Sequence, residues 1–124
     1  MHRVLFVAAV WLATLTVPAV EQDAVQLDPR HFKVEFENVQ VRVLHINIGP
    51  HERTRFYWQP PGVLVWLTDA NLKCIGVDGK TEEVHGIAKQ VAWSPATQNA
   101  CENLGDQSVE LYEIVLKPGR PFPE

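Results

Sequence analysis

The sequence lacks any block of basic residues. Its 124 residues contain 11 Lys and Arg against 15 Asp and Glu, which gives a formal net charge of −4 at neutral pH. No basic helix or Lys/Arg cluster offers a positive surface to a phosphate backbone. We therefore expect no nucleic-acid partner.

Motifs of nucleophilic and nucleotide-dependent enzymes are also missing. There is no GxSxG turn, and the seven glycines are scattered instead of forming a phosphate-binding loop. The five histidines form neither an HxH nor an HExxH pattern. The sequence therefore leaves the catalytic residues unknown.

The first twenty residues differ in composition from the rest. Residues 4–17 form an apolar run of signal-peptide length that is too short for an ordinary membrane-spanning helix. Val17 and Ala19 occupy the small-residue positions before a cleavage point. We predict a signal peptide at residues 1–20, cleaved after about Ala19. The protein would then be secreted or periplasmic, without stable membrane insertion. The alternative is an uncleaved membrane anchor, because Arg3 alone gives only a weakly basic segment before the apolar run.

After this leader, the chain has the pattern of an all-β fold. Short runs rich in β-branched and aromatic residues are separated by turn clusters every eight to twelve residues or so, and no segment keeps a 3.6-residue period. Asp78–Gly79 lies between two such runs and indicates a tight hairpin. We predict a small sandwich or barrel followed by an irregular tail at residues 118–124.

Two stretches resemble the motifs of a known family. GPHERTRFYWQPPGVLVWLTD, at residues 49–69, resembles the first cupin motif, and WSPATQNACENLG, at residues 93–105, resembles the second. Over residues 28–117 the chain is similar to a small single-domain cupin. The resemblance implies a cupin-like jelly-roll β-barrel of two sheets, with an interior that opens at one end.

The resemblance also implies where a cupin metal would bind, and this chain departs from that pattern. The HxH pair falls on Tyr57 and Gln59, the glutamate on Val63 and the last histidine on Asn99. Amide oxygens and a protonated phenol are weak ligands for the ions that imidazole binds well. We therefore expect no metal and no cofactor at this place.

The same positions predict a pocket for a small molecule. Tyr57 and Gln59 alternate along one strand and point the same way. Together with Asn99 they would place neutral hydrogen-bonding groups around the interior, with Val63 and Cys101 beside them. The other interpretation is that these side chains bond to one another or to water and only fill space.

We predict an exported cupin-domain protein that binds a small molecule without metal or serves a structural role. The alternative function is a cupin-type enzyme. Such an enzyme would use an incomplete or relocated metal site, with ligands such as His45 or His51, or a metal-free pocket with Tyr57 as the acid or base.

The tryptophans predict a homodimer. If Tyr57 and Gln59 face inward, Trp58 faces outward, and counting along the strand from Val63 places Trp66 outside as well. Two tryptophans on an outer face form the kind of apolar patch found at interfaces, and the resemblance implies pairing through an outer sheet surface. The alternative is that terminal segments cover these side chains.

The two cysteines bear on the strand order. In the jelly-roll order that the resemblance implies, the strands that contain Cys74 and Cys101 are neighbours. Cys101 lies two residues after the inward Asn99, and Cys74 faces away from the side on which Lys73 should meet water. A disulfide would close a loop of some 27 residues in an exported protein. Two separate buried thiols are the alternative, since register cannot be determined from sequence.

Overall fold

The structure is a computed structural model that describes residues 23–117 and residue 119. The predicted signal peptide at residues 1–20 and its cleavage point lie outside the described residues, as does nearly all of the predicted tail. Within the described part, no helix is both long and apolar enough to cross a membrane.

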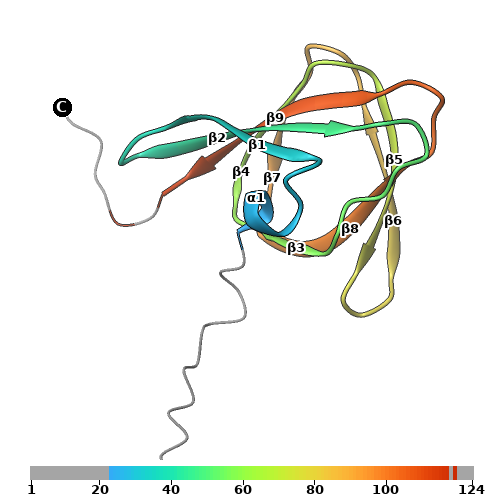
Figure 1. Cartoon of the computed structure of the whole chain (residues 1–124), viewed down its shortest axis with the longest axis horizontal. Helices are drawn as coiled ribbons and strands as arrows, with labels where there is room; N and C mark the ends of the chain where they lie inside the picture. The colour runs from blue at the N-terminus through green and yellow to red at the C-terminus, as the bar shows by residue number, and fades with distance from the viewer. Residues whose placement is uncertain (1–22, 118, 120–124) are drawn as a thin grey trace, which may run out of the picture.

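In the described residues, nine strands form two antiparallel sheets that face each other (Figure 1). The strands are β1 (Phe32–Glu37), β2 (Val41–Ile48), β3 (Tyr57–Gln59), β4 (Gly62–Trp66), β5 (Ala70–Gly76), β6 (Thr81–Gly86), β7 (Val91–Ser94), β8 (Thr97–Asn103) and β9 (Val109–Leu116). The five-stranded sheet has the order β1-β2-β9-β4-β7, and the four-stranded sheet has the order β3-β8-β5-β6. The predicted jelly roll is confirmed.

The core lies between the two sheets and follows the two-residue alternation of the strands. In β9, every second side chain from Val109 to Val115 is buried, while those between them are partly exposed. Phe32 of β1 contacts Tyr57 of β3 edge to face, with ring centroids 4.5 Å apart. This contact joins the two sheets at the N-terminal end of the fold.

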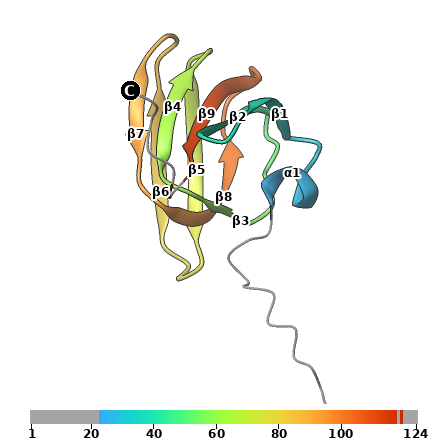
Figure 2. The ribbon, with the colours of Figure 1, turned by 90° about the vertical axis from the view of Figure 1, so that its left-hand side faces the viewer.

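A single helical turn, α1 (Ala24–Leu27), precedes the first strand and packs against β1 and β3 (Figure 2). The Asp23 carboxylate caps it by accepting a hydrogen bond from the Val25 amide. Ala24 is buried in the core. The sequence pattern did not predict this helix, because four residues are too few to show a helical period.

The turn predicted at Asp78–Gly79 agrees with the structure. β5 and β6 pair as a hairpin, and Gly79 between them has φ +81°. Lys89, in the turn before β7, also has a positive φ, of 73°. The side chain at this position therefore tolerates the left-handed region that glycine usually occupies.

The chain changes sheets at Pro60–Pro61. β3 ends at Gln59 in the four-stranded sheet, and β4 begins at Gly62 in the five-stranded sheet. Gly62 lies so close to β9 that a Cβ there would be 2.3 Å from the Ile114 carbonyl oxygen. Because the strand is interrupted by this bend, inward and outward positions cannot be counted across it.

The prediction that Val63 lines the interior was wrong for this reason. Val63 is paired with the exposed Trp93 of β7, and it does not line the cavity between the sheets. Leu64, one residue further on, does line it. The bend at Pro60–Pro61 shifts the inward positions of β4 by one residue.

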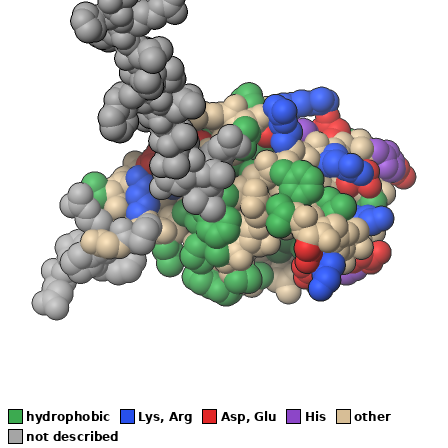
Figure 3. Space-filling view, turned by 90° about the horizontal axis from the view of Figure 1, so that it is seen from below, with side chains coloured by type: hydrophobic (Ala, Val, Ile, Leu, Met, Phe, Trp, Pro, Cys, Tyr) green, Lys and Arg blue, Asp and Glu red, His purple; other side chains and the backbone are tan. Residues whose placement is uncertain are grey.

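The outward placement of Trp66 was wrong for the same reason. Trp66 is 3% exposed, and it lies against Gly86, where a Cβ would be 2.4 Å from the indole ring. Trp58 is half-buried. Figure 3 shows hydrophobic side chains gathered on part of the face that it presents, and Trp93 of β7 is 60% exposed. The homodimer stays a prediction.

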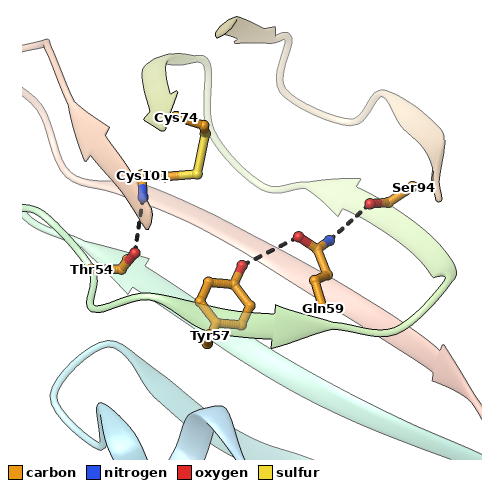
Figure 4. Close-up of a disulfide and its surroundings, with 6 residues drawn as sticks. All are labelled: Thr54, Tyr57, Gln59, Cys74, Ser94 and Cys101. Atoms are coloured by element: carbon orange, nitrogen blue, oxygen red, sulfur yellow. Dashed lines mark hydrogen bonds between the residues drawn. A yellow bond between two sulfur atoms is a disulfide. The ribbon is translucent and has the colours of Figure 1, made fainter. Parts of the chain in front are cut away.

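Cys74 and Cys101 are directly opposed on β5 and β8 and form a disulfide (Figure 4). Their Cα atoms are 4.0 Å apart, a closer approach than most disulfides have. Of the two alternatives that the sequence left open, the structure contains the bonded one. The expected adjacency of the two strands is confirmed by their register.

Candidate small-molecule pocket

A cavity of about 410 Å³ lies between the two sheets. This volume is within the range of pockets that hold small molecules. Its apolar wall includes Phe32, Ile46, Leu64, Trp66, Leu72 and Leu111. Its polar side comes from β3, β8 and the end of β7, with the side chains of Tyr57, Gln59, Ser94, Thr97 and Asn99. Cys74 and Cys101, which form the disulfide, also line the cavity.

Three polar side chains form a hydrogen-bonded chain along this wall (Figure 4). The Tyr57 hydroxyl donates to Gln59 Oε1 over 3.4 Å, and Gln59 Nε2 donates to Ser94 Oγ over 2.8 Å. The Ser94 hydroxyl in turn donates to the Pro95 carbonyl oxygen over 3.4 Å. The network therefore runs in one direction, from β3 to the end of β7.

Asn99 completes the polar wall. It is directly opposite Tyr57 in the pairing of β8 with β3, so the two side chains are neighbours on the inner face. Its Oδ1 atom is buried and has no hydrogen-bond partner among the described residues. An acceptor left in this state costs roughly 1–3 kcal/mol. The site is therefore incomplete in its hydrogen bonding at Asn99.

The structure brings together four of the five predicted pocket residues. Tyr57, Gln59, Asn99 and Cys101 all line the cavity, whereas Val63 does not. Ser94 was missed, although it is the cross-strand partner of Gly62 on an inward position of β7. Its place in the second motif marked Ser94 as a candidate, but the sequence does not show which face of a short edge strand such as β7 points inward.

Burial controls the chemistry of Tyr57. It raises the pKa of the Tyr57 hydroxyl well above its usual value, and the nearby carboxyls of Glu113 and Asp28 raise it further. The phenol therefore stays protonated near neutral pH. This favours a hydrogen-bonding role for Tyr57 over the acid/base role in the enzyme alternative.

Glu113 of β9 is a second group in the interior that the sequence did not single out. It is fully buried between its cross-strand neighbours Leu44 and Leu64, and neither carboxyl oxygen has a hydrogen-bond partner in the described part of the chain. Burial raises its pKa to about 8, and the Arg42 cation opposes this effect. The carboxyl is therefore mostly protonated at neutral pH.

Asp28, His31 and Glu52 form a polar cluster outside the cavity. The Nδ1 atom of buried His31 lies 2.8 Å from the Asp28 carboxylate, and its Nε2 atom lies 3.6 Å from Glu52. The Glu52 side chain also accepts from the Gly49 amide. These contacts fasten the start of β1 to the turn that leads into β3.

The histidines named for a relocated metal site lie apart from each other. His45 is within 3.2 Å of Glu35 and 3.1 Å of Glu110, and His51 is 2.9 Å from Asp106. Among residues 23–117 and 119, no three His, Cys, Asp or Glu side chains are grouped so that they could hold a metal ion. The relocated site stays an alternative without a located ligand set.

Comparisons with known proteins give the fold family. No protein-family model matches the chain, and no curated protein sequence is significantly similar to it. Solved structures do match. A cupin domain from Bordetella pertussis Tohama I has 19% identity and a TM-score of 0.65 over 69% of this chain and 91% of its own.

Two further structures agree. A double-stranded β-helix protein from Klebsiella pneumoniae has 15% identity and a TM-score of 0.55, covering 71% of this chain and 76% of its own. A protein from Bacillus halodurans has 19% identity and a TM-score of 0.55, covering 73% of each chain. Similarity at these identities concerns the fold and not the activity. The chain therefore has the fold of the cupin superfamily, a double-stranded β-helix of the jelly-roll type.

Proposed function

We propose that the protein is exported and that it binds a small uncharged molecule inside the barrel, through Tyr57, Gln59 and Asn99. The observation that carries this proposal is the buried oxygen of Asn99, which has no hydrogen-bond partner among the described residues and belongs to the lining of a cavity of about 410 Å³. A ligand that donates a hydrogen bond there removes the cost of that unpaired acceptor. Export is supported by the leader sequence and by the disulfide, since disulfides persist in oxidising compartments.

The charge of the lining favours an uncharged ligand. No Lys or Arg of the described residues lines the cavity. The ionisable side chains that do line it besides Tyr57 are Glu82 and His85, both on β6 and both exposed to solvent. A charged ligand placed beside Asn99 would be buried without a counterion, which is costly.

The structural interpretation makes a different prediction. If the polar wall only fills space, water satisfies Asn99, and the cavity has no preference among solutes. A ligand pocket instead discriminates between solutes of the same size by their charge and hydrogen-bonding groups. Binding selectivity therefore separates the two interpretations.

The test is a ligand-observed NMR screen of size-matched neutral, cationic and anionic fragments. We expect neutral fragments that donate and accept hydrogen bonds to bind. The triple variant Tyr57→Ala, Gln59→Ala, Asn99→Ala should lose that binding. Binding confined to strongly ionic fragments, or binding that survives in the triple variant, would overturn the proposal.

A matched control comes from the outer face of the same two strands. Trp58 and Gln98 are cross-strand partners on β3 and β8, each next to a pocket residue in sequence but pointing away from the cavity. The double variant Trp58→Ala, Gln98→Ala should keep fragment binding. Circular dichroism of each variant verifies that the fold is retained.

A further inference from the structure

The direction of the hydrogen bonds in the cavity shows which groups remain free for a ligand. Tyr57 directs its proton at Gln59, Gln59 directs one amide proton at Ser94, and Ser94 directs its proton at the Pro95 carbonyl. The hydroxyl protons of this network are therefore used within the protein. What remains at Tyr57 is the lone pairs of its oxygen, which can only accept.

Asn99 adds a second acceptor at the same place. Its buried Oδ1 has no hydrogen-bond partner in the part of the chain that the structure describes, and its side chain is adjacent to Tyr57 because the two residues are directly opposed on β8 and β3. The two acceptors therefore belong to residues that are cross-strand neighbours on the polar wall. The polar wall therefore offers these two oxygens as acceptors, while the amide protons of Asn99 and the second amide proton of Gln59 remain as donors.

The remainder of the cavity is apolar. The wall opposite Asn99 comes largely from the five-stranded sheet, including Ile46, Leu64 and Trp66. The rings of Phe32 and Trp66 suit a flat apolar body, and about 410 Å³ is room enough for one or two fused rings. A ligand that fits is therefore apolar over most of its surface, with its polar group at one end.

We infer that the ligand is an uncharged, hydroxyl-bearing apolar molecule, of which a phenol is the simplest example, and that its O–H group donates to Asn99 Oδ1 beside Tyr57. This inference rests on the proposed function and narrows it to one ligand class. A methyl ether of the same shape has no proton to donate and leaves the Asn99 oxygen unpaired. A carboxylate would face these two acceptor oxygens, with no Lys or Arg of the described residues in the lining.

The experiment compares three naphthalenes of nearly equal shape, 2-naphthol, 2-methoxynaphthalene and 2-naphthoate, by isothermal titration calorimetry at pH 7. We expect 2-naphthol to bind about tenfold or more tightly than the methyl ether, which is the value of one buried hydrogen bond. The naphthoate should bind most weakly of the three.

Variants at neighbouring positions of β8 assign the effect to one side chain. Asn99→Leu should weaken 2-naphthol binding about tenfold and remove its advantage over the ether. Asn99→Ser keeps a polar side chain, but its shorter hydroxyl no longer reaches the position of Oδ1. This variant should have the same effect, and it replaces the leucine variant if that one fails to fold. Gln98→Leu, whose side chain points away from the cavity, should leave all three affinities unchanged.

The outcomes show whether the inference fails alone or together with the proposed function. Equal affinity for 2-naphthol and its methyl ether would overturn the inference while neutral-ligand binding stands. So would failure of all three naphthalenes to bind a protein that still binds neutral fragments. Tightest binding by 2-naphthoate would overturn both the inference and the proposed function.

Discussion

Glu113 is a carboxyl group in the middle of a sheet, and neither of its oxygens has a hydrogen-bond partner within residues 23–117 and 119. An unpaired buried carboxylate is expensive, so the group retains its proton, and its pKa rises from a usual value of 4.5 to about 8. Arg42, which lowers this pKa, is bound through both guanidinium nitrogens Nη1 and Nη2 to Asp23, at 3.0 and 2.9 Å. Asp23, the cap residue of α1, thus holds the Arg42 guanidinium by two hydrogen bonds.

This group makes stability depend on pH. The pKa of Glu113 is higher in the folded state than in the unfolded state. The contribution of this group to the free energy of unfolding is therefore fully present below about pH 4.5 and is lost as the pH rises through about 8. The loss has an upper limit on the order of 5 kcal/mol. We expect Glu113→Gln, which cannot ionise, to flatten the decline in urea-unfolding free energy between pH 5 and 8.

Glu110→Gln is the matched control for this measurement. Glu110 is on the same strand, but its side chain is partly exposed and contacts His45. Its removal should leave most of the decline in place. An unchanged decline in Glu113→Gln would show that Glu113 is not the group that titrates.

Single residues differ in how far the sequence predicts them. Tyr57 and Gln59 were placed correctly because alternation holds within one uninterrupted strand. Trp66 was not, because the count crossed the bend at Pro60–Pro61. Glu113 had a signal that was not used: it has the same parity as the apolar Leu111 and Val115, so its inward facing follows from the pattern of β9.

At the scale of the strands, the disulfide joins β5 to β8, the two central strands of the four-stranded sheet. Both cysteines line the cavity, so the bond is part of its wall. β8 also carries Asn99, two residues before Cys101. The bond therefore fixes the strand on which the proposed ligand contact depends.

Removal of the disulfide should destabilise the fold. Closure of a loop with a sequence separation of 27 residues predicts a loss of about 3 kcal/mol in the free energy of unfolding for Cys74→Ala, Cys101→Ala. Chemical denaturation of oxidised wild type, reduced wild type and the double variant measures it. The two forms without the bond should match each other.

Thiol titration of unfolded, non-reduced protein should find no free thiol, and two free thiols would contradict the structure.

Strand identities were predictable, whereas the relation between the sheets was not. The hairpin at Asp78–Gly79 follows from local turn chemistry. The pairing of the two cysteine strands follows from the strand order that the resemblance implies. The step from β3 in one sheet to β4 in the other depends on how a double-proline bend turns in space. Sequence periodicity carries no information on that turn.

At the scale of the whole molecule, the cupin fold was predictable because two motifs in the right order span most of the chain. The volume of the cavity and the part of its lining that comes from β4 were not predictable, because they depend on how the sheets close around Trp66 and on which side chains β4 turns inward. The polar wall is a joint product of β3, β8 and the end of β7. Its unpaired acceptor exists only once these strands are assembled.

The most direct test of the central claim is a protein-detected NMR titration of the purified protein with 2-naphthol. The account predicts that the side-chain amide signals of Asn99 and Gln59 and the indole N–H signal of Trp66 shift together and saturate at one equivalent. The side-chain amide of outward-facing Gln98 should not move. Shifts confined to exposed apolar residues such as Val77 and Ile87, with Asn99 and Trp66 unmoved, would contradict binding inside the barrel.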